Sequence, residues 1–215
     1  MTAPHAFEGG YDAWAAEERT AKGVAATSGE RDTERAIGTK LIAAGDARTA
    51  VIRRVYPASP ETLWQAITDR THLRRWFIEP RGDLRLGGTF ALEGNAHGRI
   101  LRCDPPRMLR VTWVYGPRHA DEVEVRLTKA EGGGTVIELE HASIADTAPD
   151  GVTDALLGVG VGWELAMAHL GRHLDGDLPL PPADGSGSAL QPTPEDRQLM
   201  ATSARAWMEL LGTND

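Results

Sequence analysis

The sequence predicts an α+β domain in which a curved antiparallel sheet of about seven strands surrounds one long helix near the C-terminus. Three observations lead to this prediction. Strand-like alternation fills the middle of the chain, an apolar helical pattern follows it, and two short helical patterns come directly after the first strand. Because the sheet has one apolar face, that face needs a covering layer, and the long helix is the element suited to provide it.

The domain is expected to begin with a strand and two short helices. Residues 49–56 are β-branched and apolar, which is typical of a strand. Ser59 and Pro60 then predict a helix start, because serine is a favoured N-cap and proline suits the first helical position. Thr71 is the expected cap of a second short helix that ends near Phe77.

Further strands follow in a meander. The clearest is residues 122–129, where Val123, Val125 and Leu127 alternate with charged and polar side chains. One apolar and one polar face per strand is typical of an antiparallel sheet that is packed on one side. The predicted strands are residues 82–86, 88–93, 98–104, 108–115, 122–129 and 135–141.

Residues 151–174 carry apolar side chains at helical spacing and predict the long helix. Gly158, Gly160 and Gly162 are unusual within it, because each glycine costs about 1 kcal/mol relative to alanine in a helix interior. Either the helix starts late, near Gly162, or another group approaches its backbone closely. In both cases we expect side chains to leave the space beside the glycines unfilled, so that a ligand could occupy it.

Composition divides the chain into four segments. The third of them is rich in proline, glycine and serine, as a linker is, and the fourth carries an apolar stripe at helical spacing. We expect that stripe to dock on the domain or on a second copy of it, which leaves a homodimer as one alternative. The segments are an N-terminal extension over residues 1–47, the main domain over 48–178, the linker over 179–193 and a C-terminal helix over 194–215.

The N-terminal extension is predicted to be partly helical. Its helical patterns lie near residues 11–21 and 31–43. Phe7, Tyr11 and Trp14 form a small apolar group that we expect to dock on the main domain rather than to bind a ligand.

Several motifs follow one another in a fixed order along residues 48–211. They are Ala58-Ser59-Pro60-Glu61, Arg75-Trp76-Phe77, residues 82–88, Cys103-Asp104-Pro105-Pro106 and Gly162-Trp163-Glu164. Together they resemble the helix-grip superfamily, also called START-like, SRPBCC or polyketide-cyclase-like, and within it the bacterial homologues of heat-shock-protein ATPase activators. The resemblance implies a ligand site between the long helix and the concave face of the sheet. Members of the superfamily bind lipids, hormones and polyketides, and some are cyclases.

The predicted ligand site consists of side chains that face the interior of such a grip. Aromatic and aliphatic walls with few polar groups are typical of a small-molecule pocket. The alternative is that the same side chains simply fill a core. The predicted ligand-binding residues are Trp76, Phe77, Trp113, Ile137, Leu139, His141, Val159, Trp163 and Met167.

His141 is the candidate for acid/base chemistry. It ends the apolar face of residues 135–141, so its ring is expected to point towards the cavity, and its charge can change near neutral pH. Glu164, Glu93 or Arg99 would be its helpers. The alternative is a structural histidine that forms a hydrogen bond with a neighbouring backbone group or with Glu164.

No metal or cofactor site is predicted. Glu93, His97 and His141 match no established ligand spacing, and His169 with His173 is expected to be a solvated helix end. Residues 82–88 lack the lysine and hydroxyl residue of a phosphate-binding loop, so ATP binding is not predicted. Cys103 is expected to be a small core residue.

Charge and cysteine content limit the function. The net charge of -8 argues against affinity for nucleic acid or for anionic membrane surfaces. The single cysteine excludes an intrachain disulfide and favours a reducing, cytoplasmic location. We therefore expect a protein that binds a hydrophobic or aromatic small molecule, without evident catalysis. The alternatives are a cyclase- or hydrolase-type enzyme that uses His141, and a protein-interaction or chaperone-associated module.

Overall fold

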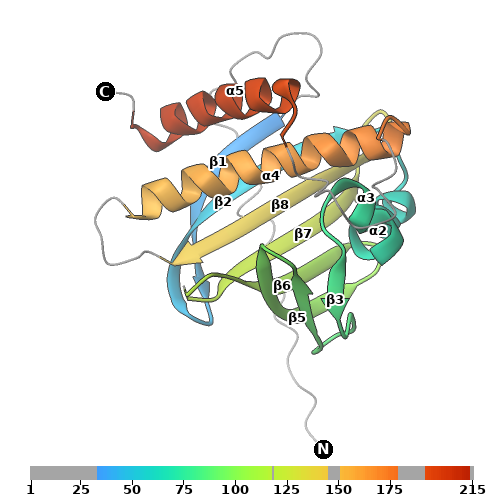
Figure 1. Ribbon diagram of the computed structural model, residues 1–215, viewed down its shortest axis with the longest axis horizontal. Helices are drawn as coiled ribbons and strands as arrows, with labels where there is room; N and C mark the ends of the chain where they lie inside the picture. Colours follow the sequence, from blue (N-terminus) through green and yellow to red (C-terminus); the bar gives the residue numbers. More distant parts are fainter. Residues whose placement is uncertain (1–32, 118, 145–150, 179–191, 214–215) are drawn as a thin grey trace, which may run out of the picture. The chain divides into compact units, whose positions relative to one another are not determined.

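The computed structural model describes residues 33–117, 119–144, 151–178 and 192–213. Within these residues eight strands form one antiparallel sheet in the order β1-β2-β8-β7-β6-β5-β4-β3 (Figure 1). This α+β arrangement agrees with the predicted fold class. The strands are β1 (Thr33–Ile42), β2 (Gly45–Tyr56), β3 (Pro80–Gly82), β4 (Thr89–Leu92), β5 (Ala96–Asp104), β6 (Met108–Tyr115), β7 (Asp121–Lys129) and β8 (Thr135–Ile144).

The predicted alternation sets the two faces of the sheet. In β7 and β8, Val125 pairs with Leu139 and Leu127 pairs with Ile137, so these apolar side chains share the concave face. On the opposite face Arg126 pairs with Glu138. A shift of one residue would exchange the two faces, so the apolar pattern fixes the register.

The expected helical run over residues 31–43 is wrong, because Thr33–Ile42 forms strand β1. It pairs along its whole length with β2, from Thr33 opposite Arg54 to Ile42 opposite Gly45. This long-range pairing outweighs the weak local helix preference. The sheet therefore begins before residue 48, and the strand predicted at residues 49–56 is β2, which begins at Gly45.

The remaining expectations for the extension and the linker lie largely outside the described residues. These are the helical pattern of residues 11–21, the group of Phe7, Tyr11 and Trp14, and nearly all of residues 179–193.

Helix α2 (Pro60–Thr68) begins as predicted, since the Ser59 hydroxyl accepts a hydrogen bond from the Thr62 backbone N–H. Helix α3 (Arg70–Trp76) is capped by Asp69 instead of the expected Thr71, because the Asp69 carboxylate accepts the N–H groups of Thr71 and His72. The strand expected at residues 82–86 is also wrong, since β3 ends at Gly82 and a tight turn follows.

Helix α4 (Gly151–Asp175) runs without a break through its glycines and lies across the concave face, where it contacts β2 and β8. The late start near Gly162 is therefore wrong. The space beside Gly160 is filled by the indole of Trp207, which a Cβ at this position would overlap. Gly158 and Gly162 are exposed. Gly160 thus allows a second helix to approach, as the expected close contact at the helix backbone requires, and the space beside it is filled by Trp207 and not left for a ligand.

That second helix is α5 (Pro194–Leu211), which packs on α4 as Figure 1 shows. Its start combines a capping box, in which Thr193 and Asp196 exchange hydrogen bonds, with a buried carboxylate. Asp196 also accepts hydrogen bonds from Arg172 at 2.5 Å and His169 at 3.2 Å. The expectation of a solvated His169 is therefore wrong, because α5 covers it.

None of the helices in the described ranges is long and apolar enough to cross a membrane.

The first prediction concerns the contact between α4 and α5. Gly160→Ala should lower the midpoint of thermal unfolding, because its methyl group would overlap the Trp207 ring, and overpacking costs about 1–3 kcal/mol. Gly158→Ala is the matched control, since nothing lies within 4 Å of that position. It should raise the midpoint, because alanine favours a helix by about 1 kcal/mol. Circular dichroism measures both, and equal shifts would contradict the prediction.

The second prediction concerns Asp196. Burial opposes its ionisation, but hydrogen bonds from Arg172, Thr193 and His169 outweigh burial and hold the carboxyl pKa well below 3.8. A lowered folded-state pKa stabilises the fold above pH 3.8, and that stabilisation is lost as the pH falls below it. Asp196→Asn should therefore be less stable than wild type in urea at pH 7, and the difference should shrink in acid. A difference independent of pH would contradict this.

Candidate functional site

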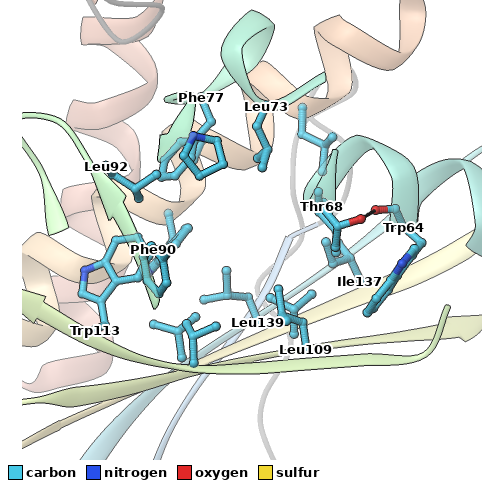
Figure 2. Close-up of a pocket in the computed structure, with 18 of the residues that line it drawn as sticks. Trp64, Thr68, Leu73, Phe77, Phe90, Leu92, Leu109, Trp113, Ile137 and Leu139 are labelled. Atoms are coloured by element: carbon cyan, nitrogen blue, oxygen red, sulfur yellow. Dashed lines mark hydrogen bonds between the residues drawn. The ribbon is translucent and has the colours of Figure 1, made fainter. Parts of the chain in front are cut away.

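A cavity of about 370 Å³ lies between the concave face of β4–β8 and the helices α2, α3 and α4. Figure 2 shows Leu109, Ile137 and Leu139 on the sheet side, with Trp64 and Thr68 on the helix side. The volume falls within the range of roughly 300–1,000 Å³ that is typical of small-molecule sites. Helix α4 contacts β2 and β8, and the cavity lies beside it, with side chains of α4 and β8 forming one side of the lining.

Aromatic rings form a nearly continuous wall of the cavity. Phe77 is stacked on Trp163 with ring centroids 5.9 Å apart, and Trp163 lies 5.1 Å from Trp113. Phe90 continues this series at 6.0 Å from Trp113, and Trp76 lies 5.4 Å from Phe77. These separations are those of favourable aromatic pairs. The wall therefore has an ordered shape as well as an apolar surface.

Among the residues that the structure describes, none of those lining the cavity carries a charged side chain. The Thr68 hydroxyl donates to the Trp64 carbonyl oxygen at 2.6 Å, and the Trp76 indole N–H donates to the Ala66 carbonyl oxygen at 2.9 Å. These two polar groups are satisfied by the protein itself, and most of the surface offered to a ligand is apolar.

Seven of the nine predicted ligand-binding residues line this cavity: Trp76, Phe77, Trp113, Ile137, Leu139, Trp163 and Met167. His141 and Val159 do not line it. The rings of Trp113 and Trp163 lie next to His141 and separate it from the cavity, and Val159 packs in the core on α4, one turn before Trp163.

Several residues of the lining were not predicted from the sequence. Trp64, Leu73, Phe90 and Leu109 are examples. A signal for Leu109 was present, because Leu109, Val111 and Trp113 alternate along one face of the same strand. The contribution of α2 through Trp64 depended on how that short helix is placed, which periodicity does not specify.

The structure does not assemble the predicted acid/base group around His141. The ring is buried, with its Nε2 atom 3.1 Å from Asp121 Oδ2, and its Nδ1 atom accepts the Trp163 indole N–H at 2.9 Å. An indole nitrogen is only a donor, so Nδ1 is unprotonated and Nε2 carries the proton. Both nitrogens are engaged, and the partners differ from the expected backbone group or Glu164.

The residues expected to assist His141 in acid/base chemistry lie away from it and form other contacts. Glu164 is fully buried and binds Arg35, Glu93 pairs with exposed Arg81 at 2.9 Å, and Arg99 donates to the Gly87 carbonyl oxygen. None of these groups lines the cavity.

Cys103 lines the edge of the cavity but is exposed, so the expected core position is wrong. Partial burial, with a smaller contribution from Asp104, raises the pKa of its thiol. His173 lies 2.9 Å from His72, and its pKa is lowered by partial burial, by His72 and by Arg75. Among the described residues, no group of three or more histidine, cysteine, aspartate or glutamate side chains could hold a metal ion.

Comparison with known proteins gives a consistent assignment. The family model described as "Activator of Hsp90 ATPase homolog 1-like protein" matches residues 57–175. The chain is similar to the crystal structure of CalU16 from Micromonospora echinospora, with 45% identity over 83% of this chain and 98% of that chain, and a TM-score of 0.69. The solution NMR structure of CalU16 gives 44% identity, 88% and 100% coverage, and a TM-score of 0.71.

A more distant likeness concerns the fold alone. PFC0360w, an HSP90 activator from Plasmodium falciparum, shares 24% identity over 60% of this chain and 97% of that chain, with a TM-score of 0.50. No curated protein matches the chain.

Proposed function

The chain belongs to the Activator of Hsp90 ATPase homolog 1-like family, as its sequence motifs predicted, and from this premise we propose that it binds an uncharged, hydrophobic and largely aromatic small molecule. The observation that carries the proposal is the cavity of about 370 Å³, with its aromatic wall and a lining that is uncharged throughout the described part of the chain.

The chemistry of the lining supports this ligand class. Transfer of apolar ligand surface from water contributes roughly 25 cal/mol per Å², and favourable ring contacts add about 0.5–1.5 kcal/mol each. A charged ligand would lose its hydration without meeting a counter-ion in the lining, which is unfavourable. The site therefore favours neutral, planar ligands.

The alternatives receive less support from the geometry. An enzyme of the cyclase or hydrolase kind needs a polar group within hydrogen-bond reach of a bound substrate, and His141 is engaged outside the lining. A chaperone-associated role is suggested by the family description. The described residues offer no separate argument for it.

The third prediction compares two ligands with the same ring system. N-phenyl-1-naphthylamine is neutral, whereas 1-anilinonaphthalene-8-sulfonate carries an added sulfonate. The neutral compound should bind at least about ten-fold more tightly, because the lining offers no partner for the anion. Fluorescence titration measures both affinities. Failure of both compounds to bind, or equal affinities, would count against the proposed ligand class.

The fourth prediction places the binding site. Leu109→Trp should greatly reduce binding of the neutral probe, because the larger ring would fill cavity space. Met108→Trp is the matched control, since Met108 is the adjacent residue on β6 and its side chain points to the opposite face of the sheet. It should bind as wild type does. Both variants are checked for folding by circular dichroism, and equal binding by the two would rule out this cavity.

A further inference from the structure

We propose that His141 is a positioning residue for the ligand site. By accepting the indole N–H of Trp163, it holds that ring as a wall of the cavity and thereby determines how well rigid planar ligands fit. The part of this inference that concerns ligands rests on the proposed function. The part that concerns the orientation of Trp163 does not.

Trp163 occupies a central position in the aromatic wall. Its ring contacts Phe77 on one side and Trp113 on another, with centroids 5.9 and 5.1 Å away. Ring contacts alone allow an indole to slide or turn, because they have little directionality at its edge. The 2.9 Å hydrogen bond from Trp163 Nε1 to His141 Nδ1 is directional and fixes the edge of the ring.

Asp121 in turn fixes the histidine. Its Oδ2 atom accepts the His141 Nε2 proton at 3.1 Å and the Ser143 hydroxyl at 3.0 Å, and its Oδ1 atom accepts the Ile144 backbone N–H at 3.2 Å. A carboxylate at Nε2 keeps the proton there and leaves Nδ1 free to accept. Asp121 therefore selects the tautomer that Trp163 requires.

A purely space-filling role would not need an imidazole. The position lies between a group that only donates, the Trp163 indole N–H, and a group that only accepts, the Asp121 carboxylate. Neutral histidine can accept at one end and donate at the other. An apolar side chain would fill the volume but leave the indole N–H without this partner.

Three variants separate positioning from packing. His141→Phe keeps a ring but removes the acceptor. His141→Asn retains an acceptor near the Nδ1 position. Asp121→Asn keeps the shape of the network but is expected to move the His141 proton from Nε2 to Nδ1. Because the Ile144 N–H requires the amide oxygen, the amide N–H then faces His141 Nε2, which moves the imidazole proton to Nδ1, opposite the Trp163 N–H.

The first measurement needs no ligand. Hydrogen exchange of the Trp163 indole N–H is followed by NMR, with the signal assigned by its loss in Trp163→Phe. Exchange should be about ten-fold faster in His141→Phe and in Asp121→Asn than in wild type, and close to wild type in His141→Asn. The nitrogen chemical shifts of the His141 imidazole should show the proton on Nε2 in wild type and on Nδ1 in Asp121→Asn. His97→Phe, at an exposed histidine on β5, is the control.

The second measurement compares pyrene, which is rigid and planar, with the more flexible N-phenyl-1-naphthylamine. Pyrene affinity should fall by about ten-fold in His141→Phe, with a smaller loss for the flexible probe and recovery in His141→Asn. An unchanged affinity ratio together with a protected Trp163 N–H would overturn the inference. If neither probe binds wild type, the proposed function fails, and the exchange measurement alone decides the role of His141. If His141→Phe does not fold, Asp121→Asn supplies the same two comparisons.

Discussion

The site depends most on the hydrogen bonds that the buried carboxylate of Glu164 accepts from Arg35 and Trp207. The carboxylate has no exposed surface, and it accepts hydrogen bonds from Arg35 on β1, with both N–O distances 2.6 Å, and from the Trp207 indole on α5, also at 2.6 Å. A buried charge is tolerated only when it is paired and hydrogen-bonded, so these contacts hold three elements together. Because Trp163 precedes Glu164 in α4, the rotation of the helix that Glu164 fixes also turns Trp163 and Met167 towards the cavity.

The polar and apolar groups of the domain have separate roles as a result. Hydrogen-bonded charges such as Glu164, Asp121 and Asp196 lie outside the cavity and position the helices and rings around it. The cavity itself presents rings and aliphatic groups. This is the reverse of a typical catalytic site, where polar groups converge on the reacting atoms. An apolar lining with aromatic walls is typical of small-molecule pockets.

Support for the site comes from parts of the chain that never touch it. Strand β1 and helix α5 do not line the cavity, yet β1 supplies Arg35 and α5 supplies Trp207 to the anchor of α4. Gly160 makes this possible, because only a glycine lets the Trp207 ring lie against the helix backbone. These additional elements therefore help to build the cavity.

The sequence by itself determined the alternating faces of the central strands, the start of α2 at Ser59 and the apolar length of α4, because these depend on local periodicity and capping. Those features were enough for the fold class and for seven of the residues that line the cavity. Only the tertiary structure decided that residues 33–42 form a strand, that Trp207 fills the space at Gly160 and that His141 faces Trp163 instead of a ligand. The physical reason is that these outcomes depend on contacts between residues far apart in the chain, where long-range pairing and packing outweigh local preference.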